Sequence, residues 1–219
     1  MTATSRLLCF LIVATCSLPA WSQGSAEAGA TKAATCLACH GTNGNSVNPL
    51  WPKLAGQNAA YIATQLRHFH EKRRTGKADD ATAQLMPPMA AALSEQDIQD
   101  LAAYYSLQTP TGGEANPEYW KAGQKLYHGG DRARGIPACA ACHGPLGSGN
   151  PAAGYPQLRA QHAEYITHEL ESYRARTRYS VDEKGNSKGG DNANMMHTIV
   201  ERLSAEDIRN VAAYLEGMR

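Results

Sequence analysis

Phenylalanine occurs only twice among the 219 residues, and no segment shows a sustained alternation of apolar and polar side chains. Without that alternation half-buried β-strands are not expected, so the chain is predicted to be all-α. A domain of about 90 residues with so few large apolar side chains has a thin core. Something other than protein side chains is therefore expected to fill its interior.

The chain also lacks an excess of charge of either sign. It has 21 basic and 20 acidic residues, and loss of Arg6 with the N-terminal segment leaves 20 of each. Binding to phosphate groups needs a basic footprint, so nucleic acid is not an expected partner. The clusters "HFHEKRR" at 68–74 and "RARTR" at 174–178 are interpreted as solvated helix ends.

No apolar run is long enough to cross a bilayer. The run from Leu7 to Leu18 has 12 residues, whereas a spanning helix needs about 20. Arg6 precedes this run and "PAWS" follows it, so residues 1–22 are predicted to be a cleaved signal peptide. Export predicts a periplasmic protein, with loose membrane association left open. A retained anchor and a lipid on Cys16 are the alternatives.

Three segments of the first half return in the second half, which indicates a duplicated fold. The pairs are 35–41 with 138–144, 51–66 with 155–170, and 93–105 with 203–215. The offset between matching segments grows from 103 to 104 and then to 110 residues, so the second copy has extra residues between these segments. Insertions in the loops between conserved elements are what a duplicated fold tolerates.

The segment at 106–119 is rich in proline, glycine and small polar residues. This composition is typical of a linker. The chain is therefore predicted to form two domains, residues 24–108 and 115–219, joined by a linker at 109–114.

Each copy is predicted to contain three helices. The first leads into a cysteine motif, and the second spans roughly 58–74 or 162–178. The last begins after Ser94 or Ser204, because each serine is a good N-cap with an acidic residue three positions later.

Two Cys-x-x-Cys pairs are each followed at once by a histidine, which is the attachment sequence of c-type haem. Two thiols on one helical turn can each form a thioether to a haem vinyl group, and the next side chain then reaches the iron. The predicted attachment residues are Cys36, Cys39, Cys139 and Cys142, and the predicted proximal ligands are His40 and His143. The sequence thus predicts two covalently attached haems.

Other uses of these cysteines fit less well. A zinc ribbon needs its pairs about 15–20 residues apart, and a thioredoxin-like dithiol needs a βαβ unit. Disulfides within each pair remain an alternative, although they leave the paired histidines and the sparse core unexplained.

The repeat selects a sixth ligand for each iron. Met86 and Met196 each lie eight residues before the capping serine of the last helix. The neighbouring candidates Met89, Met195 and His197 match Ile199, Leu85 and Pro87 in the other copy. His197 remains a rival, since imidazole is also a good axial ligand. Histidine and methionine together leave no open site on the iron, which favours an electron carrier over an enzyme.

The duplicated "CxxCHG", the "WPKLAGQ" stretch and the final "LSxxDI" helix together resemble the dihaem cytochrome c4 family, from about residue 26 onward. The resemblance implies two class I cytochrome c domains facing each other across a pseudo-twofold interface, with haem propionates near it. It also implies a periplasmic carrier that moves electrons from a quinol-oxidising complex to a terminal oxidase. The carrier is expected to be a monomer.

The same resemblance suggests roles for four further residues. Pro52 and Pro156 would offer carbonyls to the ring N–H groups of the haem histidines, although both also suit ordinary turns. Arginines such as Arg67 or Arg174 would neutralise the propionates.

Two alternative functions stay open at this point. A dihaem peroxidase would keep one iron open, which requires that Met86 or Met196 not bind. An electron-accepting subunit of a periplasmic dehydrogenase would have the same domains as a free carrier.

Overall fold

The computed structural model describes residues 24–218, and the predicted signal peptide and Cys16 lie outside them. The described residues form helices and loops, with three isolated β-bridges and no strand. The all-α prediction is confirmed. Within this part of the chain no helix has the length and apolar character that crossing a bilayer requires.

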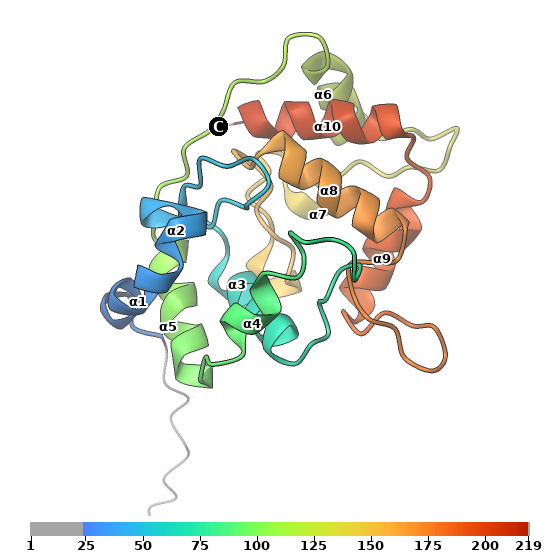
Figure 1. Cartoon of the computed structure of the whole chain (residues 1–219). Helices are drawn as coiled ribbons and strands as arrows, with labels where there is room; N and C mark the ends of the chain where they lie inside the picture. Colours follow the sequence, from blue (N-terminus) through green and yellow to red (C-terminus); the bar gives the residue numbers. More distant parts are fainter. Residues whose placement is uncertain (1–23, 219) are drawn as a thin grey trace, which may run out of the picture.

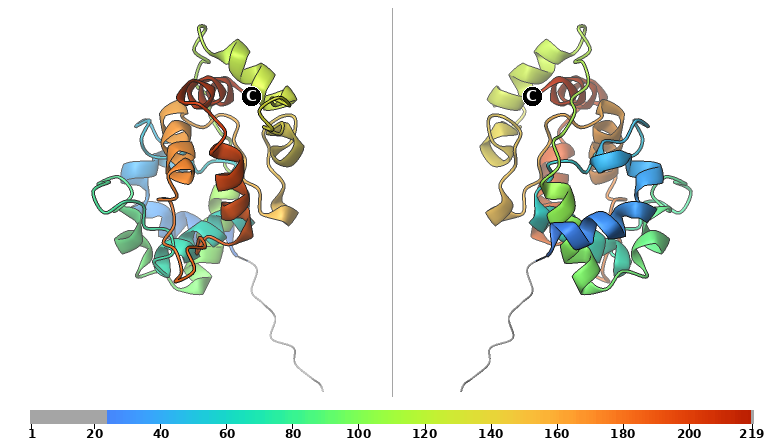
Figure 2. Two further views of the ribbon diagram at one scale, coloured as in Figure 1. Left: turned by 90° about the vertical axis from the view of Figure 1, so that its right-hand side faces the viewer. Right: turned by 90° about the vertical axis from the view of Figure 1, so that its left-hand side faces the viewer.

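The two copies form two domains that lie side by side, with residues 107–119 running between them along one edge of the molecule (Figures 1 and 2). The first domain contains α1 (Ala26–Lys32), η1 (Ala33–Thr35), α2 (Leu37–His40), η2 (Thr42–Gly44), α3 (Ala59–His70), α4 (Met86–Ala90) and α5 (Glu95–Ser106). The second contains α6 (Trp120–Gly129), α7 (Ala140–His143), η3 (Pro151–Ala153), α8 (Ala163–Arg174), α9 (Asp191–Val200) and α10 (Ala205–Gly217).

The predicted helices are present, and their starts are better defined than their ends. The Ser94 hydroxyl accepts a hydrogen bond from the Asp97 amide, while the Asp97 carboxylate accepts one from the Ser94 amide, and Ser204 and Asp207 repeat this capping box. The second helix of each domain stops four residues before the predicted end, because the chain turns away after α3 and α8.

In each domain the first and last helices cross at a glycine. Gly29 of α1 lies against the backbone of Asp100 in α5, and Gly123 of α6 lies against the backbone of Asn210 in α10. A Cβ atom at Gly123 would be 1.9 Å from the Asn210 carbonyl oxygen. Only glycine lets these backbones approach so closely. The crossing therefore fixes the position of the first helix of each domain, which leads into the cysteine motif.

We expect Gly123→Ala to lower the free energy of unfolding by about 1–3 kcal/mol, because the added methyl group forces α6 away from α10. Urea unfolding of the holoprotein measures the change. Gly129→Ala is the matched control, since nothing lies within 4 Å of a Cβ at that end of α6. Equal stability of the two variants would show that the crossing tolerates a side chain.

Candidate haem sites

Each cysteine motif lies on a single helical turn. Cys36 precedes α2 and Cys39 lies within it, so both thiols belong to one turn that ends at His40. Cys139, Cys142 and His143 repeat this arrangement around α7. All four cysteines in the described part of the chain are free, so the disulfide alternative is wrong for this structure.

The two motif histidines are buried and held in the same way. Nδ1 of His40 bonds to the carbonyl oxygen of Pro52 at 2.9 Å, and Nδ1 of His143 bonds to that of Pro156 at 3.0 Å. The expected role of both prolines is confirmed. Each histidine is 6% exposed, and burial lowers the pKa of both imidazoles, which favours the neutral form that binds metals.

This bond leaves one nitrogen of each ring available. With Nδ1 donating its proton to a carbonyl, the lone pair sits on Nε2. Nε2 of neither motif histidine forms a hydrogen bond with any residue of 24–218. Both imidazoles therefore keep one nitrogen free for a metal.

The interior of the second domain is divided into two apolar clusters. One contains Tyr127, Val211 and Leu215, and Cys139 packs against it. The other contains Ile136 and Val200, with Met196 packed against it. Leu170 packs against both clusters, so the cysteine side and the methionine side border one apolar interior. The residues present therefore fit a covalently attached haem.

The candidate sixth ligands differ in exposure. Met89 is 51% exposed and Met195 is 40% exposed. Met86 begins α4 and is half-buried, and Met196 is half-buried within α9.

The rival ligand His197 is already engaged on both nitrogens. Its Nδ1 bonds to the Tyr173 carbonyl oxygen at 2.8 Å, and its Nε2 accepts a hydrogen bond from Nε of Arg176 at 2.7 Å. An iron ligand needs one free ring nitrogen. His197 therefore holds α9 against the end of α8.

Two glutamines, one from each domain, form equivalent side-chain hydrogen bonds to the backbone of the opposite domain. The Gln57 side chain donates to the Gln157 carbonyl at 2.9 Å and accepts from its amide at 2.8 Å. The Gln161 side chain makes the same pair of bonds to the backbone of Lys53, at 2.9 and 2.8 Å. Positions 57 and 161 match in the repeat, as do 53 and 157. Reciprocal contacts of this kind define the pseudo-twofold interface that the resemblance implied.

Comparison with known proteins supports the same assignment. The cytochrome c family model matches residues 26–106 and again residues 120–219. Cytochrome c4 of Azotobacter vinelandii is 40% identical over 201 residues, which is 91% of each chain. The chain belongs to the cytochrome c4 family.

A solved structure agrees with this membership. The reduced recombinant cytochrome c4 from Pseudomonas stutzeri superposes with a TM-score of 0.78 at 39% identity, covering 90% of this chain and all of that one. The thiosulfate dehydrogenase electron acceptor of Thiomonas intermedia (strain K12) is 35% identical over 211 residues, 94% of this chain and 88% of that protein.

As a cytochrome c4, the protein is an electron-transfer cytochrome that carries two covalently attached haem c groups. A bound haem supplies an iron that gains and loses one electron. The chain's own contribution is to hold the two groups at a fixed separation and to set the polarity around them.

A buried charge cluster lies in the interface of this cytochrome c4. Arg74 and Arg178 are matching residues of the repeat, and they are 9% and 4% exposed. Both bind the single carboxylate of Glu169, with Nη2 of Arg74 at 2.8 Å from Oε2. The first-domain match of Glu169 is the neutral Gln65, whose side-chain oxygen accepts a bond from Arg74 at 2.9 Å.

Two guanidinium groups thus share one carboxylate, and one positive charge stays uncompensated by protein. Burial alone would raise the pKa of the Glu169 carboxyl, but Arg178 and Arg74 hold it well below its usual range. An uncompensated buried charge is costly. The interface also holds a buried ring nitrogen, Nδ1 of His68, without a hydrogen-bond partner. The interface therefore contains a buried, net positive cluster that would bind an anionic group such as a haem propionate.

Arg67 and Arg174, the arginines suggested for binding propionates, are not part of this cluster. Arg67 forms an exposed ion pair with Glu95, and Arg174 donates to the Leu203 carbonyl at 3.3 Å within its own domain. The basic clusters were also misread as entirely solvated, since Arg74 and Arg178 are buried. The signal that could have found them was present, because they are arginines at matching positions of the repeat.

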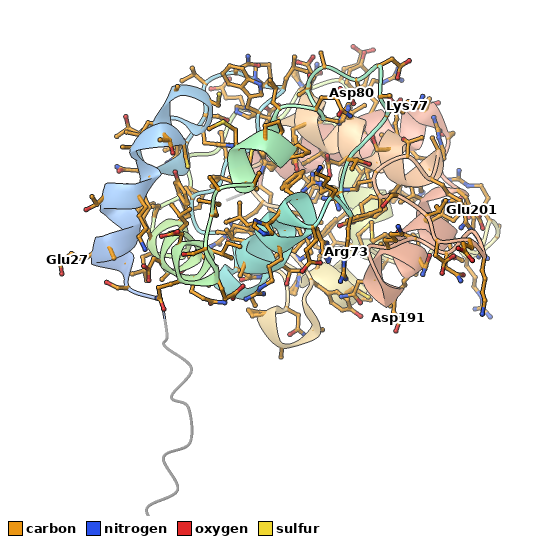
Figure 3. The ribbon with its side chains drawn as sticks, turned by 60° about the horizontal axis from the view of Figure 1, so that its bottom comes forward. Glu27, Arg73, Lys77, Asp80, Asp191 and Glu201 are labelled. Carbon is orange, nitrogen blue, oxygen red and sulfur yellow. The ribbon has the colours of Figure 1, made fainter. Side chains whose placement is uncertain are left out.

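An ion pair with a titratable member also crosses the interface. Nε2 of His168 on α8 lies 2.6 Å from Oδ2 of Asp80, which is on the loop after α3 (Figure 3). Hydrogen bonding to Glu169 raises the pKa of His168 most, burial opposes this effect and Asp80 adds to it, giving a value of about 9.

A histidine pKa raised from 6.5 to about 9 means that folding favours the protonated ring. Its stabilisation is complete below about pH 6.5 and is lost as the pH rises through about 9. We expect the urea midpoint of the holoprotein to fall more over this interval than that of His168→Gln. Parallel pH profiles for the two proteins would contradict this role.

Proposed function

We propose that each iron is held between a histidine and a methionine, with the haem attached through the adjacent cysteine pair. The assigned attachment residues are Cys36, Cys39, Cys139 and Cys142, and the assigned axial ligands are His40, Met86, His143 and Met196. Such an iron is closed to substrate, so the protein acts as an electron carrier and not as an enzyme such as a dihaem peroxidase.

The observation that carries the assignment is the difference between neighbouring side chains on the distal side. His197 has both nitrogens engaged, and Met195 is more exposed than Met196. Met196 is half-buried and packs against the apolar cluster of the second domain. In the first domain Met86 is half-buried while Met89 is exposed. A thioether opposite an imidazole favours reduced iron and raises its potential, which suits a carrier.

The carrier is proposed to work in the periplasm after cleavage of residues 1–22. Its domains are proposed to span residues 24–108 and 115–219, with the linker at 109–114, and one chain carries both haems as a monomer. The proposed electron donor is a quinol-oxidising complex and the proposed acceptor is a terminal oxidase, with loose association to the membrane.

A second candidate places the protein as the electron-accepting partner of a periplasmic dehydrogenase. It is favoured by the likeness to the thiosulfate dehydrogenase electron acceptor of Thiomonas intermedia. Both functions need the same pair of closed irons. Co-purification from native extract with a dehydrogenase, or with a terminal oxidase, distinguishes the two.

Optical spectra of the oxidised holoprotein test the ligands. We expect Met86→Leu and Met196→Leu each to remove about half of the near-infrared band that arises from methionine-to-iron charge transfer, since each change affects one of two haems. The reduced variants should bind one carbon monoxide per protein, and one of the two midpoint potentials should fall.

Met89→Leu and Met195→Leu are the matched controls, and both should keep the full band and refuse carbon monoxide. Loss of the band in Met195→Leu, or stoichiometric carbon monoxide binding by the unaltered protein, would overturn the assignment.

A further inference from the structure

Each domain has two tyrosines in ring contact beside its cysteine turn. In the second domain the ring centroids of Tyr127 and Tyr214 are 5.6 Å apart, and both side chains lie in or against the apolar cluster on which the first cysteine of the motif packs. Tyr104 and Tyr105 repeat this arrangement in the first domain at 4.9 Å. These separations are those of interacting aromatic rings. Tyr104 and Tyr214 match in the repeat, but the buried partner comes from α5 in one domain and from α6 in the other.

Three of these four hydroxyl groups have no partner that can take a proton. Tyr127 donates to a backbone carbonyl at 2.6 Å and Tyr104 donates to a side-chain amide oxygen at 3.2 Å, and neither kind of oxygen is a base. The buried hydroxyl of Tyr105 has no hydrogen-bond partner among residues 24–218. A phenol that keeps its proton is hard to oxidise, because the oxidised ring is left with a positive charge whose burial is costly. These three side chains are therefore packing residues.

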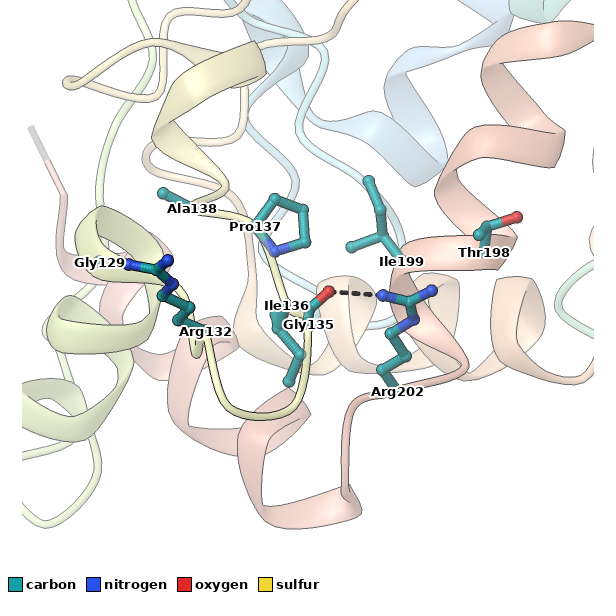
Figure 4. A pocket seen from close by; sticks show the side chains of 9 residues that line it. All are labelled: Gly129, Arg132, Gly135, Ile136, Pro137, Ala138, Thr198, Ile199 and Arg202. Atoms are coloured by element: carbon teal, nitrogen blue, oxygen red, sulfur yellow. Dashed lines mark hydrogen bonds between the residues drawn. The ribbon is translucent and has the colours of Figure 1, made fainter.

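The hydroxyl of Tyr214 is different, because it lies 2.8 Å from Nε2 of His128. When the neutral imidazole carries its proton on Nδ1, Nε2 accepts this hydrogen bond and is able to take the proton. His128 is exposed in the last turn of α6, so it exchanges protons with water. The loop that continues from α6 is held in place by Arg202, whose Nη1 donates to the Gly135 carbonyl at 2.7 Å (Figure 4).

The first domain has no equivalent of this tyrosine–histidine pair. Counted from the crossing glycines Gly29 and Gly123, His128 corresponds to Ala34. Tyr104, the match of Tyr214, is left with the amide oxygen of Asn43 as its acceptor. The two matching tyrosines therefore share a place in the fold and differ in whether a base is beside them.

We propose that Tyr214 and His128 form a redox-active tyrosine site at which the protein reacts with small one-electron oxidants, such as the carbonate radical. Tyr214 loses one electron to the oxidant, its O–H bond breaks, and the proton passes to Nε2 of His128. The base lowers the barrier to this oxidation, because the proton leaves as the electron does and no charge develops on the ring.

The phenol is restored by one electron from the reduced second haem and by return of the proton from His128. The path for this electron is packed throughout, since Tyr127 contacts Tyr214 and belongs to the cluster on which Cys139 packs. The net reaction moves one electron from the haem to the oxidant and leaves both side chains unchanged. A protein whose irons are closed to ligands thereby reacts with an oxidant at its surface. This restoring step rests on the proposed haem attachment at Cys139, whereas the oxidation of Tyr214 does not.

Flash-generated tris(bipyridine)ruthenium(III) serves as the one-electron oxidant, and EPR of freeze-quenched samples detects the tyrosyl radical. We expect a tyrosyl signal in the fully oxidised holoprotein, and Tyr214→Phe should remove most of it. His128→Gln should slow formation of the radical about a hundredfold, which is the contribution typical of a positioned base. In the reduced holoprotein the radical should decay faster, with haem oxidation following the same time course.

Tyr104→Phe is the matched control, and it should keep the full signal because this tyrosine has no base beside it. A full signal in Tyr214→Phe, or an unchanged rate in His128→Gln, would overturn the redox-active site. Equal lifetimes of the radical in the oxidised and reduced proteins would overturn the restoring step. A wrong sixth ligand would instead appear in the optical spectrum and leave the tyrosyl signal of the oxidised protein in place, so the two failures are distinguishable.

Discussion

One hydrogen bond in each domain decides what the cysteine turn can do. The proline carbonyl that binds Nδ1 of His40 or His143 fixes both the tautomer and the plane of the ring. Nε2 is then free to bind a metal, and the cysteines that directly precede each histidine and begin its turn define where a haem can be attached. On the proposed function, Met86 or Met196 would complete the coordination of the iron on the other side.

The interface between the domains holds the two cysteine–histidine sites in one molecule. Gln57 and Gln161 bond to backbone groups of the opposite domain, so each domain is located by main-chain atoms that cannot rearrange independently. The cluster of Arg74, Arg178 and Glu169 adds a buried charge that protein groups do not fully balance. The glutamine contacts thus hold the two domains together, and the arginine cluster gives their interface a net positive charge.

Duplication has preserved the fold while the chemistry of the two copies has diverged. Gln65 and Glu169 occupy matching positions but differ by one charge, and the loop before α7 has no counterpart before α2. These differences lie at the interface and at the outer surface of the second domain, while the glycine crossing and the capping boxes are kept. The two domains therefore share the same helix packing, while the residues around each haem site differ.

The sequence by itself determined the all-α class, the duplication, the cysteine and histidine sites and the starts of the last helices. Each of these depends on contacts within a few residues, or on a repeat that can be measured along the chain. Tertiary structure alone decided that Arg74 and Arg178 are buried, that Arg67 and Arg174 bind elsewhere and that His197 is fully engaged. Burial and hydrogen-bond partners come from segments about 100 residues apart, and local composition does not record which of two neighbouring arginines will face the other domain.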